Sequence, residues 1–330
     1  FAYEFTTTHV YRAENPSTAE RMAVVAQGGY GRGLLAPGSD IDLLFLLPYK
    51  QTAWGESVAE YMLYLLWDLG FKVGHAARTI SQCVRLSMAD MTIRAALLDS
   101  RLILGDEKLF AEYLHRFRRE VLDVDARAFV EVKLAEQYTR HYRAGGSRYL
   151  VEPNIKEGTG GLRDLHTLHW LAKHIYPDQA EEEFVEAGVF TPGEYSSFRR
   201  CEFFLWTVRC HLHFLTGRAE ERLSFDLQRA MAERLGYRDH GGLSGVERFM
   251  KHYFMIALEV GQLTRIVCTA LELKQLKSVP SLNALFAPFN WRRRAKLRRT
   301  SDFRIENGRI STVAKDAFST DPVNFIRLFV

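Results

Sequence analysis

Hydrophobic residues near the start of the chain come in short runs bounded by glycine and proline, a pattern typical of buried strands. We expect strands at 22–27, 41–48 and 71–80, and one helix at 53–69 that Gly70 ends. A glycine-rich turn, and no full helix, separates the first two strands. The order strand, turn, strand, helix, strand predicts a small unit built around a mixed sheet.

From about residue 85 the apolar residues recur at spacings of three and four, which is typical of amphipathic helices. Thr191 and Glu194 form a capping box, and Ser244 with Glu247 marks the start of the last helix. We place the helices at 91–104, 106–122, 126–143, 162–175, 191–215 and 244–276. The predicted fold class is therefore α+β, with a small mixed-sheet domain followed by an all-helical domain.

These patterns divide the chain into three parts, at 1–120, 121–280 and 281–330. The last part is a basic tail. In it, Asn307-Gly308 lies between two alternating runs and predicts a hairpin with a type I′ turn. The basic run at 291–299 holds a single aromatic residue, so a solvated or partner-facing patch is favoured over a nucleic-acid site.

Composition limits the class of protein. The 330 residues are 47% hydrophobic and 25% charged, enough for a packed core, and the net charge of +4 does not by itself indicate a nucleic-acid binder. No apolar run approaches the ~20 residues that span a bilayer, and no signal-peptide pattern is present. The four cysteines form no CxxC pair. We expect a cytoplasmic protein without membrane contact and, because Phe1 stands in place of Met, a piece of a longer one.

Two aspartates follow a glycine cluster in the stretch GGYGRGLLAPGSDIDLL (28–44). Asp40 and Asp42 are two residues apart at the start of a strand, so both carboxylates project from one face. Two carboxylates this close repel unless a cation lies between them, and Mg²⁺ binds one or two carboxylates together with phosphate oxygens. Taken alone, the pair also fits a turn residue followed by a solvated one.

The glycines favour the metal interpretation. Gly28 and Gly29 directly follow a strand, and such a turn offers backbone N–H groups to phosphate oxygens. The guanidinium of Arg32 can add two parallel hydrogen bonds to a phosphate group. A tight turn with a surface arginine is the alternative. The residues 31–36 also fit GxGxxA, but a dinucleotide fold needs a full helix after the glycines, and Pro37 breaks the chain there.

The stretch resembles the motif of the nucleotidyltransferase superfamily, which has a polymerase-β-like fold. More narrowly, the chain resembles the bacterial PII uridylyltransferase/uridylyl-removing enzymes, which are nitrogen sensors. Further stretches carry this resemblance and together span most of the chain: VGHAART (73–79), EPNIKEGTGGLRDLHTLHW (152–170) and FLWTVRCHLHFLTGRAEERLSFDLQRAMAERLGY (204–237). The resemblance makes the first part, 1–120, a nucleotidyltransferase domain.

The resemblance implies Mg²⁺-dependent transfer of UMP from UTP to a tyrosine hydroxyl of the trimeric PII signalling protein, with release of pyrophosphate. Gly28 and Gly29 match the paired small residues that hold the nucleotide phosphates. Asp40 and Asp42 match the catalytic aspartates that bind the metal. The remaining candidates for nucleotide binding are Arg32, Ser39, Lys156 and Arg163.

Superfamily members often have a third metal-binding carboxylate on a neighbouring strand. The strand expected at 71–80 carries none, and Gly74 and His75 occupy that region. Asp90 and Asp99 are near in sequence but fall in a helical pattern, where charged residues are usually solvated. We therefore expect a metal site of two aspartates.

The glycine-rich segment 153–164 precedes a helix and carries Lys156 and Arg163. It fits a loop over the nucleotide or the acceptor, with these side chains on phosphate. It equally fits a structural crossover held by an Arg–Asp network. His211 and His213 are two residues apart on a predicted helix and point to nearly opposite faces, so we expect structural histidines there and no metal site.

Two other functions stay open. One is an adenylyltransferase of the kind that modifies glutamine synthetase, which shares the transferase fold; the residues do not reveal which base is selected. The other is a non-catalytic nucleotide-sensing module. Full-length members of the resembled family continue into a phosphohydrolase domain that removes UMP and into glutamine-sensing domains. This sequence has no His-Asp dipeptide, so we expect no removal of UMP by it. Because the resemblance places glutamine sensing beyond Val330, we also expect no response to glutamine.

Overall fold

The computed structural model describes residues 2–11, 20–124, 126–143, 150–177, 181–186, 188–277, 303–306 and 309–312. Residues Phe1–Glu272 form one compact unit and Leu273–Val330 a second. In the second unit, β5 (Phe303–Glu306) and β6 (Arg309–Thr312) pair antiparallel. The predicted hairpin strands are thus confirmed, while the turn residues 307–308 and the basic run 291–299 lie outside the described residues.

A four-stranded sheet begins the first unit. Its strands are β1 (Ala23–Ala26), β2 (Ile41–Leu47), β3 (Val73–Thr79) and β4 (Arg101–Gly105), in the order β3-β2-β1-β4. β1 pairs antiparallel with β2 and β4, whereas β2 and β3 run parallel. The mixed sheet and the three predicted strands are confirmed, and the fold is α+β.

Strand β4 corrects one prediction, a single helix over 91–104. The helix α5 (Met91–Leu98) ends earlier, and the chain then runs along the free edge of β1. A short apolar run such as RLIL does not reveal by its periodicity whether it is helix or strand. Pairing with β1 decides between the two, because it satisfies backbone groups that would otherwise stay open at the sheet edge.

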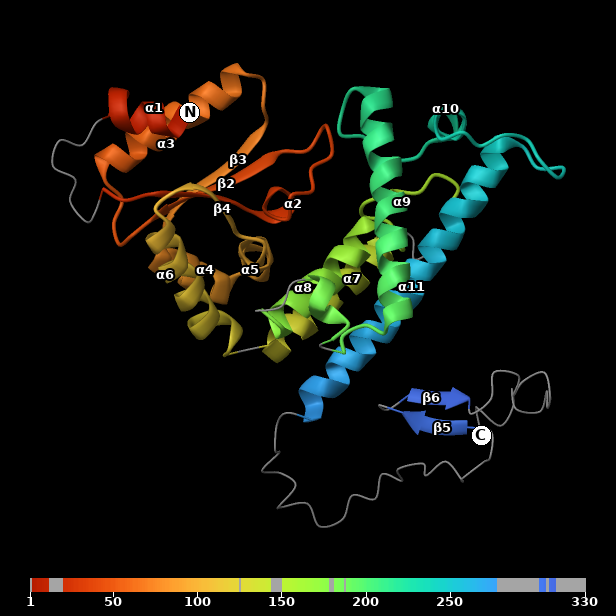
Figure 1. Cartoon of the computed structure of the whole chain (residues 1–330). Coiled ribbons are helices and arrows are strands. Elements are labelled where there is room, and N and C mark those ends of the chain that lie inside the picture. The colour runs from red at the N-terminus through yellow and green to blue at the C-terminus, as the bar shows by residue number, and fades with distance from the viewer. Residues whose placement is uncertain are drawn as a thin grey trace, which may run out of the picture. The chain divides into compact units, whose positions relative to one another are not determined.

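Helices cover both faces of the sheet (Figure 1). On one face α3 (Ala53–Asp68) packs on Val24 and Phe45, and α1 (Ala2–Phe5) and the π-turn η1 (Thr6–Val10) contact α3. The other face packs against α4 (Ile80–Ala89), α6 (Glu107–Phe117) and the π-turn η2 (Arg118–Leu122). Helix α4 was not predicted, although its capping box of Thr79 and Gln82 is a visible sequence signal.

The rest of the first unit is helical, as predicted. Its elements are α7 (Ala126–Arg143), α8 (Leu162–Ile175), η3 (Glu181–Phe184), α9 (Pro192–Thr216), α10 (Phe225–Arg234) and α11 (Gly245–Lys277), which extends into the second unit. Helix α8 matches its predicted bounds. The capping box of Thr191 and Glu194 forms both of its hydrogen bonds.

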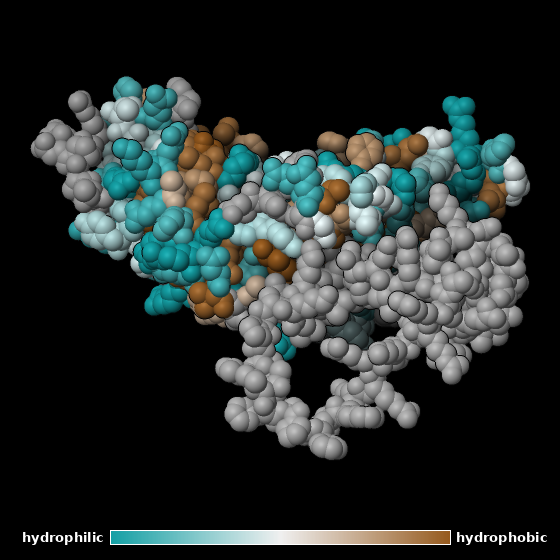
Figure 2. Space-filling view, turned by 60° about the horizontal axis from the view of Figure 1, so that its bottom comes forward, coloured by the Kyte–Doolittle hydropathy of each residue, from teal (hydrophilic) through white to brown (hydrophobic). Residues whose placement is uncertain are grey.

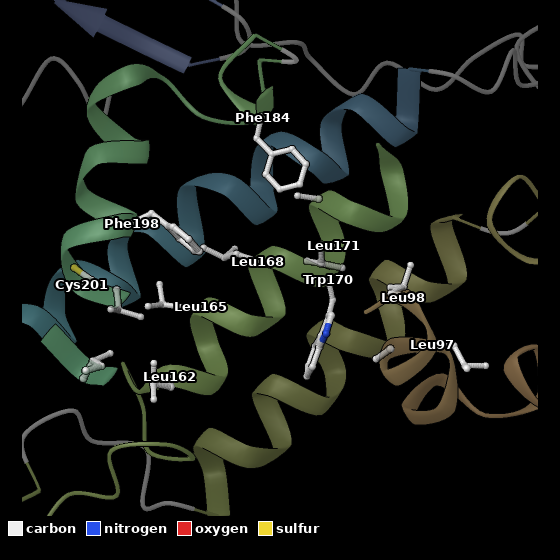
Figure 3. Close-up of a cluster of buried hydrophobic side chains, with 14 of the residues drawn as sticks. Leu97, Leu98, Leu162, Leu165, Leu168, Trp170, Leu171, Phe184, Phe198 and Cys201 are labelled. Atoms are coloured by element: carbon white, nitrogen blue, oxygen red, sulfur yellow. The ribbon is translucent and has the colours of Figure 1, made fainter. Parts of the chain in front are cut away.

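The helical region and the sheet domain share one hydrophobic core. Figure 3 shows Leu97 and Leu98 of α5 beside Trp170 of α8, while Leu165 of the same helix faces Cys201 of α9. Buried side chains therefore continue without a break from the sheet into the helices. This shared core fixes the sheet and helices against each other, and the domain boundary near residue 120 stays a prediction.

On the face drawn in Figure 2, hydrophobic residues lie in separate patches among hydrophilic ones. Within the described ranges, no helix is both long enough and apolar enough to cross a membrane. Of the cysteines, Cys83 and Cys201 are buried and Cys210 is half-buried, and all three are unbridged.

Candidate active site

The glycine turn and the aspartate pair meet where β1 ends and β2 begins. The backbone N–H of Gln27 donates to the carbonyl of Asp42 at 3.0 Å. The following residues form one helical turn, α2 (Gly28–Gly31), in which Gly28 has a φ of 54°. A Cβ added to Gly28 would lie 3.5 Å from a carboxylate oxygen of Asp42. The backbone of Gly28, which carries no side chain, therefore lies next to the carboxylate of Asp42.

Gly74 makes room for this carboxylate. The register of β2 and β3 places Gly74 opposite Asp42. A Cβ added to Gly74 would come within 2.5 Å of Asp42 Oδ1, closer than a real Cβ approaches another atom. Any larger residue at this position would displace the Asp42 carboxylate from its place in the structure.

The electrostatics of the pair fit a bound cation. Partial loss of hydration against the cleft wall, and next the negative charge of Asp40, raise the pKa of Asp42, while Lys156 lowers it. A divalent cation between the two carboxylates would remove this repulsion. In the part of the chain that the structure describes, no group of three or more His, Cys, Asp or Glu is placed to hold a metal. Phosphate and water oxygens would therefore complete the shell, as Mg²⁺ prefers.

A cleft of about 680 Å³ opens over the pair. The sheet domain forms one wall, and α7, α8, α9 and the loop before α8 form the other. Its acidic lining residues are Asp40, Asp42, Glu136, Glu157 and Glu221. Its basic lining residues are Arg32, Lys72, Lys133, Arg140, Lys156, Arg163 and Arg209. This excess of positive charge suits an anionic ligand such as a nucleoside triphosphate.

Helix α9 holds the loop that leads to Asp40. The Gly38 N–H donates to Nδ1 of His213 at 3.1 Å, and Arg209 Nη2 donates to Oγ of Ser39 at 3.3 Å. Arg209 in turn pairs with Glu221 at 2.8 Å. His213 is thus structural, as expected, but its contact with this loop was not predicted. No local sequence signal could reveal partners 175 residues apart.

The segment before α8 brings Lys156 into the cleft. The Asn154 side chain accepts from the N–H groups of Lys156 at 3.0 Å and Glu157 at 2.7 Å, which fixes the turn. Lys156 is half-buried, and its ammonium lies near enough to Asp42 to lower the pKa of that carboxyl. Burial and next the charge of Arg209 lower the pKa of Lys156 itself. The lysine therefore faces the aspartates across the cleft.

The buried carboxylate of Asp164 holds the same segment through several hydrogen bonds. Asp164 accepts from the Gly160 N–H at 2.8 Å and from His141 Nε2 at 2.8 Å, and it pairs with Arg140. Arg163 instead bonds Glu157 at 2.8 Å and lines the cleft. The segment thus combines both interpretations, since an Arg–Asp network supports it and Lys156 and Arg163 face the cleft.

Arg32 lines the cleft but has a partner. Its guanidinium pairs with Asp99, which also accepts from His169 Nε2 at 3.0 Å and Trp170 Nε1 at 2.8 Å. Burial alone would raise the pKa of Asp99, but the bond from His169 and the charge of Arg32 hold it at about 2. Asp99 therefore ties the glycine turn to α8.

The two considered third carboxylates lie apart from the aspartate pair. Asp99 is enclosed in this ion network with 1% of its surface exposed, and Asp90 caps α5 by accepting from the N–H groups of Thr92 and Ile93. Neither lines the cleft. We include neither in the metal site.

Two parts of the chain match models of known protein families. Residues 14–96 match the family model for a nucleotidyltransferase domain, and residues 128–268 match the model for GlnD PII-uridylyltransferase. Proteins called bifunctional uridylyltransferase/uridylyl-removing enzyme are similar: one from Rhodopseudomonas palustris is 58% identical over 98% of this chain, and one from Bradyrhizobium diazoefficiens is 57% identical over 99%. The chain spans 35% of the length of each.

The mixed sheet, with its glycine turn beside an aspartate pair, and the match over 14–96 define the first part of the chain as a nucleotidyltransferase domain. The helical region that forms the other wall of the cleft matches a second, narrower model. The chain belongs to the GlnD PII-uridylyltransferase family.

Proposed function

We propose that this chain transfers UMP from UTP to a tyrosine hydroxyl of a PII protein and releases pyrophosphate, in a reaction that needs Mg²⁺. The observation that carries the proposal is the aspartate pair beside the glycine turn in a cleft lined with positive charge. The names of relatives with 58% and 57% identity support the choice of UTP.

In this proposal Asp40 and Asp42 hold Mg²⁺, which supplies charge stabilisation to the triphosphate and lowers the pKa of the attacking hydroxyl. The backbone of Gly28 and Gly29 approaches the phosphate oxygens, since no Cβ blocks that path. Lys156 neutralises charge on the phosphates from the opposite wall. The bond from the tyrosine oxygen to the α-phosphorus forms as the α-phosphorus bond to pyrophosphate breaks, and the phenol proton passes to solvent water.

Arg32 and Ser39 act by position in this proposal. The Asp99 carboxylate holds the Arg32 guanidinium at the edge of the cleft, and Arg209 holds Ser39 just before the metal aspartates. Arg163, paired with Glu157, lines the cleft from the helical wall. These contacts keep charged groups ordered before the nucleotide enters, which lowers the cost of binding.

Pyrophosphate release tests the proposed reaction. The chain is mixed with Mg²⁺, a nucleoside triphosphate and PII, and pyrophosphate is followed over time. We expect release with UTP, only when Mg²⁺ and PII are both present. Release with ATP in preference to UTP would indicate the adenylyltransferase. Binding of nucleotide without any release would indicate the sensing module.

Lys156→Met should weaken binding of Mg-UTP by about ten- to a hundredfold. A charge-assisted hydrogen bond to phosphate contributes roughly 1.5–3 kcal/mol, and methionine keeps the length of the side chain without its charge. The melting temperature should not fall, because Lys156 takes part in none of the ion pairs found among the described residues. Calorimetry measures the affinity. Lys108→Met, on the exposed face of α6, is the control, and equal affinity in both variants would contradict the role of Lys156.

Gly74→Ala should lower the transfer rate about tenfold or more while the fold persists. The new methyl group would occupy the space of Asp42 Oδ1 and push the carboxylate away from the metal position. Initial rates and circular dichroism measure the two effects. Gly193→Ala is the control, since an added Cβ there meets no atom within 4 Å. A normal rate for Gly74→Ala would show that the position of Asp42 does not matter.

A further inference from the structure

Helices α8 and α9 place unpartnered nitrogen atoms in the cleft wall. His166 is 5% exposed, and neither of its ring nitrogens has a hydrogen-bond partner among the described residues. Nε1 of Trp206 is likewise buried without a partner. Both residues line the cleft that holds the aspartate pair. Buried donors and acceptors are normally satisfied, so these atoms have room for a bond to a ligand or to ordered water.

The two rings are neighbours that are tilted to each other. The centroids of His166 and Trp206 are 6.3 Å apart at an interplanar angle of 42°, and the Trp170 ring lies 6.0 Å from His166 at 53°. The guanidinium of Arg209 lies over the Trp206 ring at 5.0 Å, and that of Arg163 lies over Trp170 at 5.5 Å. Flat aromatic and guanidinium groups of this kind are the surfaces on which nucleobases stack.

The charge around this surface is already balanced. Arg32, Arg163 and Arg209 surround His166, and each is paired with its own carboxylate. Burial, and next these guanidiniums, keep the pKa of His166 well below its usual value, so the ring is neutral. A neutral imidazole offers one donor and one acceptor. A neutral polar ligand therefore fits better here than a further phosphate group.

The phosphates have their own place on the other side of the cleft. The glycine turn, Asp40 and Asp42 come from the sheet domain, and Lys156 faces them. A nucleotide whose phosphates lie there extends its base toward the opposite wall. From this arrangement, which rests on the proposed function, we propose that His166 and Trp206 read the nucleobase of the bound nucleotide.

The hydrogen-bond pattern fits uracil. Trp206 Nε1 is a donor only, so it requires a carbonyl or another acceptor on the base. His166 supplies an acceptor for a ring N–H. Uracil has a carbonyl on each side of its N3–H and satisfies both residues. Adenine also has a donor next to an acceptor, but in the reverse order: the acceptor is ring N1 and the donor is the exocyclic amino group. The positions of Trp206 and His166 along the edge of the base therefore decide between the two bases.

Two variants test this with Mg-UTP and with Mg-tripolyphosphate, which has no base. Trp206→Phe and His166→Phe delete the unpartnered nitrogens and keep aromatic rings. Each should weaken UTP binding by about tenfold, the effect of one lost buried hydrogen bond, and leave tripolyphosphate binding unchanged. Trp67→Phe, at a tryptophan outside the cleft that is 43% exposed, is the control and should change neither affinity.

Analogues of UTP with sulfur in place of O2 or O4 locate the contact. Sulfur accepts hydrogen bonds weakly, so the penalty of Trp206→Phe should shrink with one analogue and persist with the other. Unchanged UTP affinity in both variants would overturn the base-reading role and leave the transferase proposal intact. Parallel loss of tripolyphosphate affinity would overturn it in favour of a phosphate contact. A wild type that binds no nucleotide would overturn both proposals together.

Discussion

Asp40→Asn and Asp42→Asn should each lower the rate of UMP transfer by about a thousandfold or more. Asparagine keeps the size of the side chain but removes the negative charge that holds the metal. The charge stabilisation lost with a misbound Mg²⁺ amounts to several kcal/mol, and about 4 kcal/mol corresponds to a thousandfold in rate. Initial rates at saturating UTP and Mg²⁺ measure the effect for each variant.

The melting temperatures of the variants show whether a lower rate comes from loss of the metal site or from loss of the fold. The raised pKa of Asp42 means that its charged form is disfavoured in the folded protein, partly by Asp40, so neither substitution should lower the melting temperature. Asp68→Asn, at an exposed position near the end of α3, is the matched control and should keep the wild-type rate. A near-normal rate in either site variant would show that the pair does not bind the catalytic metal.

Asp99→Asn should destabilise the protein by about 3–5 kcal/mol. The substitution removes the fully buried carboxylate of an ion pair and leaves the positive charge of Arg32 uncompensated, which is the costly way to break such a pair. Urea unfolding measures the change. Asp90→Asn is the matched control, because asparagine caps a helix about as well as aspartate and should cost little. Equal stability of the two variants would contradict the structural role of Asp99.

The pH dependence of this difference has a defined sign. The pKa of Asp99 is lowered from 3.8 to about 2, so its charge adds stability that is fully present above the unfolded value and is lost as the pH falls through the folded value. The stability difference between wild type and Asp99→Asn should therefore be about 1 kcal/mol smaller at about pH 3 than at about pH 6. A difference that is constant over this range would mean that Asp99 is not ionised in the folded protein.

Local patterns were enough to predict most elements. The apolar spacing between Leu162 and Ile175 predicted α8 to the residue, and the capping signals placed the starts of α9 and α11. The error at β4 has a tertiary cause: residues 101–105 become a strand because β1 offers a free edge, and nothing within that short run reveals the edge.

The same limit applies to the cleft. Asp40, Asp42 and the glycines stand together in the sequence, so their chemistry could be inferred before their geometry. Arg209 reaches Ser39 across 170 residues, and Asp99 reaches His169 across 70. Such contacts depend on how α8 and α9 pack on the sheet domain. The unpartnered nitrogens of His166 were unpredictable for the same reason, because a missing partner is visible only once all neighbours are placed.

The central claim is that the cleft over Asp40 and Asp42 transfers UMP to a tyrosine of PII. The most direct measurement is the intact mass of PII after incubation with this chain, Mg²⁺ and equal concentrations of UTP and ATP, followed by peptide mapping of the modified residue. The account predicts a mass increase of one UMP per modified PII subunit, on a tyrosine, which is absent when Asp42→Asn replaces the wild type. An AMP adduct, or an adduct that persists with Asp42→Asn, would contradict it.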